Sequence, residues 1–397
     1  MRSFTLLLLL LSCWACQSDA GQQPLSEVPE ERPPLSVDYE DADYKWGFAD
    51  AGGRLVIPAE YDEVRGFGPE KLALVRQNGE WNFISLDPAG TGEATGKKKS
   101  KSWSMAWSYV NGLARVRAEN DSIGFINVKG EMVINPTFSD AGDFSESKVA
   151  WVKRGNHYGL IDKSGNLILP VNYEKLVPAG EDRFIFRQNR KYGLIDGVGK
   201  VLVKPNYKKL KPFAENGLAA VKENDLYGYI DRSGNWHLQP AFLQASNFSE
   251  GRAVVTTQAE KLELIDATGK NYLREEYTQL WYANESRWLV EKNGKYGTID
   301  ADGSIVIPLV FDEIQPASEG LMVYQQGPGW GFLSAMDGTP ITPPAYGLAW
   351  PFKNGFARVA TNRGLSLIDT TGQLRLPPLY LDLRDGSQGL FPVQTIK

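Results

Sequence analysis

Residues 295–311 read KYGTIDADGSIVIPLVF, and this short pattern recurs along the whole chain. An aromatic residue and Gly297 open a short apolar run that is typical of a β-strand. Asp300 and Gly303 then fit a tight turn, because Asp accepts local backbone hydrogen bonds and Gly tolerates a positive φ. A second apolar run ends at Pro308, which cannot donate to a β-ladder. The pattern therefore predicts an antiparallel β-hairpin.

The hairpin pattern occurs ten times with an almost constant spacing. The positions equivalent to Gly297 are Gly47, Asn82, Gly124, Gly159, Gly193, Gly228, Glu263, Gly297, Gly331 and Ser366. Neighbouring positions are 34 or 35 residues apart, except Asn82 and Gly124, which are 42 apart. In most copies an aromatic residue follows 14 positions later: Tyr61, Phe138, Tyr173, Tyr207, Phe242, Tyr277, Phe311 and Tyr380. Two markers that keep the same phase indicate a tandem repeat.

The predicted fold is all-β, with each repeat forming three or four short antiparallel strands. Propeller blades usually span about 40–45 residues, and about 4–8 of them close a ring. Ten shorter repeats favour an open, curved or superhelical array, and a propeller-like closed ring is the alternative.

The glycine after the aromatic residue needs an explanation, because glycine weakens a strand unless another group needs the space. We expect an aromatic side chain of the same or the neighbouring repeat to lie across this bare backbone.

The N-terminal segment predicts export. Residues 1–16 contain Arg2 and a run of six leucines, too short to span a bilayer and typical of a signal peptide. The order Leu-Leu-Ser before Cys13 resembles a bacterial lipobox, which implies acylation of Cys13. Cys16 and ordinary cleavage after Ala20 are the alternatives. Residues 17–43 are acidic and contain four prolines, so they are expected to form a tether before the repeat domain at 44–397.

Composition argues against several functional classes. The net charge is −5 with both signs well mixed, so we expect no nucleic-acid partner. Both cysteines lie in the first 16 residues, and only His157 and His237 are available as imidazole groups. We therefore expect no metal, no cofactor and no enzymatic activity. The repeated aspartates are interpreted as turn residues.

The largest departure from the repeat is an insertion at about 87–106 in the second copy. It contains a basic run and two tryptophans outside the frame: Lys97, Lys98, Lys99, Lys101, Trp103 and Trp107. Cations beside aromatic rings could bind an anionic envelope polymer. The alternatives are a solvated loop for the lysines and core packing for the tryptophans.

The repeated aromatic-glycine pairs, beginning at Trp46-Gly47 and continuing through Tyr158-Gly159, Tyr192-Gly193, Tyr227-Gly228, Tyr296-Gly297 and Trp330-Gly331, resemble the bacterial WG-repeat family over about residues 44–380. The resemblance implies an exported, envelope-associated β-repeat protein and transfers no catalytic residues.

We expect a binding or scaffold module on an outer-membrane lipoprotein that faces the periplasm or the cell surface, with secretion as the alternative. The membrane would be reached by the lipid anchor only, and the partner would be an envelope protein or polysaccharide. The alternative functions are an envelope glycan hydrolase, a carbohydrate-binding protein and a structural subunit of an envelope assembly.

Overall fold

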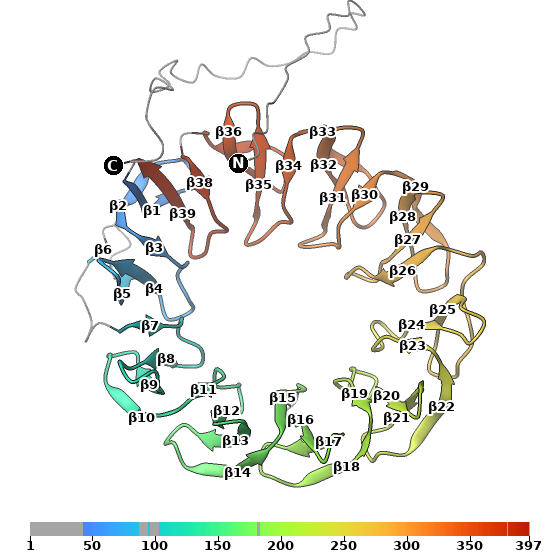
Figure 1. The fold of residues 1–397 in the computed structure, drawn as a ribbon. Coiled ribbons are helices and arrows are strands. Elements are labelled where there is room, and N and C mark those ends of the chain that lie inside the picture. Colours follow the sequence, from blue (N-terminus) through green and yellow to red (C-terminus); the bar gives the residue numbers. More distant parts are fainter. Residues whose placement is uncertain (1–42, 87–93, 96–102, 181–182, 379, 397) are drawn as a thin grey trace, which may run out of the picture. The chain divides into compact units, whose positions relative to one another are not determined.

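The computed structural model describes residues 43–86, 94–95, 103–180, 183–378 and 380–396. These residues form strands and turns and contain no helix. The strands make ten small antiparallel sheets, which follow one another around a ring (Figure 1). The prediction of an all-β tandem repeat is confirmed.

One complete sheet shows the plan of the repeat. Its four strands are β15 (Lys175–Pro178), β16 (Arg183–Gln188), β17 (Lys191–Asp196) and β18 (Val201–Tyr207). They are hydrogen-bonded in sequence order, with β15 on the inner side of the ring and β18 on the outer side (Figure 1). The β16–β17 turn places Asn189 and Arg190 at positive φ, as a two-residue hairpin requires.

The other sheets repeat this plan. The remaining innermost strands are β3 (Glu63–Val64), β7 (Met105–Ala106), β11 (Asp140–Ala141), β19 (Lys209–Leu210), β23 (Gln244–Ala245), β26 (Gln279–Tyr282), β30 (Glu313–Ile314), β34 (Leu348–Ala349) and β38 (Asp382–Leu383). The remaining second strands are β4 (Leu72–Gln77), β8 (Leu113–Arg117), β12 (Val149–Arg154), β20 (Ala219–Glu223), β24 (Ala253–Thr256), β27 (Trp288–Lys292), β31 (Leu321–Gln326), β35 (Phe356–Thr361) and β39 (Leu390–Ile396).

The third strands carry the aromatic-glycine position, and the outer strands follow them. The remaining third strands are β1 (Tyr44–Asp50), β5 (Glu80–Leu86), β9 (Ile123–Asn127), β13 (His157–Asp162), β21 (Leu226–Ile230), β25 (Leu262–Ile265), β28 (Lys295–Ile299), β32 (Gly329–Ser334) and β36 (Gly364–Asp369). The remaining outer strands are β2 (Leu55–Tyr61), β6 (Ala94–Thr95), β10 (Met132–Phe138), β14 (Leu167–Tyr173), β22 (Trp236–Phe242), β29 (Ile305–Phe311), β33 (Pro340–Tyr346) and β37 (Leu374–Leu376).

The ring closes through a sheet that both ends of the folded chain build. The strand order in this sheet is β2-β1-β39-β38, and Val393 of β39 pairs with Gly47 of β1. The Tyr380 hydroxyl also donates to the Gly53 carbonyl at 2.8 Å. Of the two expected arrangements, the structure has the closed ring and not the open array.

The expectation of an open array rested on repeat length, and the innermost strands explain why that argument failed. Most of them contain only two residues, so a repeat of 34 or 35 residues still supplies four strands. The first folded repeat supplies only the third and outer strands of its sheet, and the last supplies only the inner and second strands. Together these four strands form one complete sheet.

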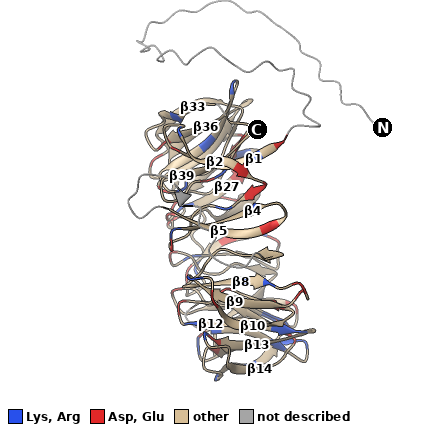
Figure 2. Cartoon of the chain, turned by 90° about the vertical axis from the view of Figure 1, so that its left-hand side faces the viewer, with Lys and Arg blue, Asp and Glu red and all other residues tan. Residues whose placement is uncertain are grey.

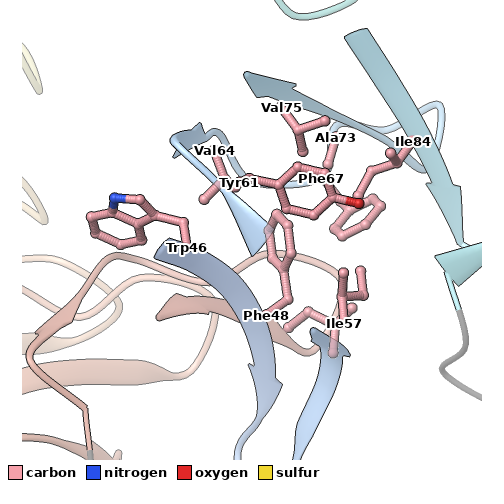
Figure 3. Packing of buried hydrophobic residues seen from close by; sticks show 10 residues of the cluster. Trp46, Phe48, Ile57, Tyr61, Val64, Phe67, Ala73, Val75 and Ile84 are labelled. Carbon is pink, nitrogen blue, oxygen red and sulfur yellow. The ribbon is translucent and has the colours of Figure 1, made fainter. Parts of the chain in front are cut away.

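The hydrophobic core lies between neighbouring sheets. Figure 3 shows Phe48 and Ile57 of the closing sheet facing Val75 and Ile84 of the next sheet. The rings of Phe48 and Phe67 lie 5.0 Å apart between their centroids. Each sheet therefore buries its side chains against the sheets on both sides, as stacked sheets do.

The space beside the repeated glycine is filled by backbone, and the expectation of an aromatic occupant was wrong for most copies. Tyr192 pairs with Tyr207, but Leu194 pairs with Val203, so β18 bulges opposite Gly193. A Cβ on Gly193 would lie 2.5 Å from the Val203 carbonyl oxygen and 2.8 Å from the Phe186 ring. At Gly47 and Gly124 the three nearest atoms all belong to the outer strand's backbone. The glycine makes room for the bulge.

Two of the three copies without this glycine have a short or missing outer strand in the part of the chain that the structure describes. No outer strand pairs with β25, which carries Glu263, among the described residues. The outer strand beside Ser366 has three residues. Beside Asn82, residues 94–95 and Trp103 pair with β5, and the residues between them lie outside the described part of the chain. All seven copies with the glycine have an outer strand of seven residues. The glycine and the full outer strand therefore occur together.

Candidate binding surface

The innermost strands combine one constant position with one variable position. Their second residue is always buried and apolar: Val64, Ala106, Ala141, Leu176, Leu210, Ala245, Leu280, Ile314, Ala349 and Leu383. Their first residue is half-buried or exposed and changes in character from sheet to sheet: Glu63, Met105, Asp140, Lys175, Lys209, Gln244, Gln279, Glu313, Leu348 and Asp382. We call these ten variable residues the inner rim. The scaffold is therefore uniform while the chemistry of the inner rim is not.

Hydrogen bonds between successive loops hold the surroundings of the inner rim in place. The Glu319 carboxylate accepts the N–H groups of Asn354 at 2.6 Å and Gly355 at 2.8 Å in the next loop. The Glu285 carboxylate likewise accepts the N–H of Gly320 at 2.8 Å, and the Asn284 amide donates to the Ala317 carbonyl at 3.0 Å. These links join loops of adjacent sheets, so binding at the inner rim would cost little additional ordering.

A depression of about 600 Å³ opens beside the inner strands β19, β23 and β26. Lys209, Lys211 and Lys222 line one part of it, and Trp281 and Tyr282 line another. Sequence reasoning missed this pocket because its two sides come from repeats that are not adjacent. The available signal was the run Lys208-Lys209-Leu210-Lys211, which has three positive residues, whereas the equivalent run of every other copy has at most one.

The lysines of this pocket differ in their surroundings. The Lys211 ammonium donates to the Ala245 carbonyl at 2.8 Å. Burial, and then the nearby Lys209 charge, lower the pKa of Lys211 below its ordinary value. The Lys222 ammonium lies 5.4 Å from the centroid of the Tyr227 ring.

Two predicted binding residues, Trp103 and Trp107, lie among packed residues. The Trp103 backbone pairs with Trp81 on β5, where other copies pair their two frame aromatics, as Tyr192 does with Tyr207. Its side chain is buried. Trp107 is half-buried, and the Arg115 guanidinium lies 4.7 Å from its ring centroid. Both tryptophans therefore have structural partners.

The other predicted binding residues, Lys97, Lys98, Lys99 and Lys101, lie outside the described residues, as do Cys13 and Cys16. The basic-loop site and the lipid anchor stay predictions. Of the frame residues, Trp46 is buried with the Arg384 guanidinium 3.9 Å from its ring centroid, and Trp330 is half-buried on β32.

The repeated aspartates shape turns, as the sequence predicted. One Asp162 oxygen accepts the N–H groups of Ser164 and Asn166 at 2.8 and 2.9 Å, and Gly165 has a φ of 86°. The same pair of bonds occurs at Asn127. Hydrogen bonds from the Thr268 side chain and from backbone N–H groups lower the pKa of Asp266 to about 2. These carboxylates accept hydrogen bonds from nearby backbone N–H groups.

Other chemical groups do not converge in the described part of the chain. His157 and His237 are both exposed, and His237 Nε2 lies 3.0 Å from the Ala267 carbonyl oxygen. No three His, Cys, Asp or Glu side chains of these residues are grouped to hold a metal ion. Figure 2 shows both basic residues, in blue, and acidic residues, in red, along this side of the ring. None of the residues searched forms a helix with the length and hydropathy to cross a membrane.

Solved structures with related architecture are distant from this chain. A eukaryotic initiation factor has 12% identity and a TM-score of 0.42, with 84% of this chain and 95% of that chain covered. BamB from Moraxella catarrhalis has 12% identity, a TM-score of 0.32 and coverages of 72% and 95%. The computationally designed protein Ika8 has 9% identity, a TM-score of 0.34 and coverages of 68% and 93%. A search of curated protein sequences found no significant match.

A family model described as "WG containing repeat" matches seven segments, namely residues 46–81, 123–156, 158–192, 192–227, 227–257, 296–327 and 330–363. Six of these segments begin at or next to a frame aromatic, and together they cover more than half of the sequence. The chain therefore belongs to the WG-repeat family.

Proposed function

We propose that this protein is a non-enzymatic binding module that a lipid on Cys13 holds at the cell envelope. Its partner is an envelope protein or polysaccharide, which contacts the inner rim. The observation that carries the proposal is the alternation on the innermost strands, where a uniform buried residue supports a neighbour whose chemistry changes from sheet to sheet.

The fold supports this assignment because a repeat architecture is suited to binding or scaffolding. Such arrays keep their frame constant and vary the side chains on one surface. A uniform rim would suit a purely mechanical ring. A rim that carries Glu63, Lys175, Gln244 and Leu348 at equivalent positions instead offers a specific pattern of charge and apolar contact.

Site-specific photo-crosslinking in cells tests the rim as the contact surface. A photoreactive amino acid replaces Leu348 on the inner strand β34, which is 50% exposed. The controls are Leu167 on β14 and Ile305 on β29, which are 49% and 51% exposed and lie on outer strands. We expect an adduct with an envelope component from position 348 and none from positions 167 and 305. Adducts from the outer positions alone, or from none of the three, would contradict the proposal.

Cell fractionation tests the anchor separately. Cys13→Ser should leave the signal segment unprocessed or release the protein from membranes, because the acylated cysteine is the expected attachment point. If the Cys13→Ser protein matures normally and stays with the membranes, Cys13 is not the anchor, and Cys16→Ser is the next variant to compare.

A further inference from the structure

The pocket beside β19, β23 and β26 begins with an unfavourable arrangement of like charges. Lys209 and Lys222 are direct partners across the β19–β20 pair, so their side chains lie on one face of the sheet. Lys211 lines the same pocket. Like charges at such positions destabilise a sheet. The arrangement favours an anion that would neutralise them.

The three lysines also have no carboxylate partner among the residues that the structure describes, although neighbouring lysines do. Lys208 pairs with Asp225 at 3.2 Å, and Lys295 pairs with Asp312 at 2.6 Å. In the preceding repeat, Lys175 holds the position of Lys209, but its cross-strand partner Arg187 pairs with Glu174 at 3.3 Å. The unpaired cluster is thus a feature of this pocket and not of the repeat.

The rest of the pocket lining suits a ring-shaped, hydroxylated ligand. Tyr282 is half-buried and lies on the face of β26 that meets β24 and β25, so its ring gives aromatic surface, which packs well against the flat apolar face of a sugar. Gln244 and Thr256 add amide and hydroxyl groups. A volume of about 600 Å³ is within the usual range of about 300–1,000 Å³ for small-ligand sites.

We infer that this pocket binds an anionic saccharide, meaning a sugar that carries a carboxylate or a phosphate group. Lys209, Lys211 and Lys222 meet the anionic group, and Tyr282 contacts the sugar ring. The inference rests on the proposed binding function and names the ligand class for one part of the ring. Both a free sugar and a residue within a polysaccharide present this chemistry.

Calorimetric titration of the full-length protein tests the ligand class. The probes are glucuronic acid, glucose 6-phosphate, glucose, inorganic phosphate and adenosine monophosphate. We expect at least one of the two anionic sugars to bind. Glucose and phosphate should bind about tenfold more weakly or not at all, because glucose lacks the anionic group and phosphate lacks the sugar ring. Added salt should weaken the binding of the anionic sugars.

Three results would overturn the inference. These results are no binding of either anionic sugar, binding of inorganic phosphate as tight as that of glucose 6-phosphate, and binding of adenosine monophosphate tighter than that of both sugars. An oligomer of galacturonic acid distinguishes the two sources of the ligand. Tighter binding of the oligomer than of the monomer indicates a polysaccharide, and equal binding indicates a single sugar.

Substitutions connect the binding to this pocket. Lys209→Gln and Lys222→Gln should each weaken binding of the anionic sugar about tenfold, since a charge-assisted contact is lost. Lys208→Gln, which breaks the pair with Asp225 but leaves the pocket lysines in place, should leave it unchanged. Tyr282→Ala should weaken binding of the sugar.

The variants also separate a binding role from a structural one. Because Lys209→Gln and Lys222→Gln remove like-charge repulsion, they should leave the melting temperature unchanged or raise it while they weaken binding. Equal loss of binding in Lys208→Gln, or no loss in either pocket variant, would exclude this site. Failure of the titrations together with intact crosslinking from position 348 would remove the ligand assignment and leave the proposed function standing.

Discussion

At the scale of single residues, the repeated glycine is set by backbone geometry. The sequence indicated that this position needs space, but it did not show what fills the space. The bulge is a shift of register between two paired strands, and the residues of one strand do not show where its partner shifts. The feature of the sequence that accompanies the bulge is a proline, which every seven-residue outer strand contains.

The first prediction concerns this glycine. Gly193→Ala should lower the free energy of unfolding by about 1–3 kcal/mol, because the new Cβ would lie 2.5 Å from the Val203 carbonyl oxygen. Gly347→Ala is the control, since its Cβ would lie 3.6 Å from the nearest atom, the Ala360 carbonyl oxygen. Urea denaturation measures both. Equal stability of the two variants would show that the bulge does not require a glycine.

The second prediction concerns the aspartate turns. The pKa of Asp266 is lowered to about 2 in the folded protein, whereas an unfolded aspartate has a pKa of about 3.9. The folded state therefore gains stability from the ionised group above the unfolded pKa, and this gain disappears as the pH falls toward 2.

Asp266→Asn removes this titration but can keep the turn, because Asn127 makes the same two backbone contacts naturally. The variant should be less stable than the wild type at pH 6, and the difference should shrink between pH 4 and pH 2. Denaturation curves across this range measure it. A difference that stays constant with pH would mean that the ionised carboxylate contributes nothing.

At the scale of elements, the sequence predicted the hairpins but not the innermost strands. An aromatic run, an Asp-Gly turn and a second apolar run extend over about seventeen residues, so their periodicity is readable. Most innermost strands have only two residues and therefore no periodicity. The sequence did not assign Trp103 to the repeat pattern, because extra residues precede it. Its pairing with Trp81 shows that it holds the position of the second frame aromatic.

The third prediction concerns the sheet that carries Glu263. Its third strand β25 has no paired outer strand, and the Leu264 N–H is bonded instead to the Asn271 side chain at 3.2 Å. Amide hydrogens in Leu262–Ile265 should therefore exchange faster than those in Lys295–Ile299 of β28, which is paired on both sides. Hydrogen exchange with mass spectrometry measures this, and equal rates would argue that a missing outer strand has no effect on local stability.

At the scale of the whole molecule, closure of the ring joins strands that are far apart in the sequence. Repeat patterns are local, so they predicted the sheets and left the relation between the first and the last sheet open. The pocket was not predictable for the same reason, since its lysines and Tyr282 come from different repeats. The ring closes because β1–β2 and β38–β39 each supply half of one four-stranded sheet. The Arg384 guanidinium also donates to the Val64 carbonyl at 2.9 Å across the junction with the next sheet.

The last prediction follows from this closure. A chain that ends at Gln388 lacks β39, which leaves β1–β2 as an isolated hairpin and β38 without its partner. Two-stranded hairpins are marginally stable in water, so the ring should open. Solution scattering should then show a larger maximum dimension, and the melting temperature should fall. Removal of residues 1–42 provides the comparison for the melting temperature, because no strand of the ten sheets is lost, and it should leave the melting temperature unchanged. A truncated chain with the scattering profile of the intact ring would show that contacts other than the β1–β39 ladder hold the two ends together.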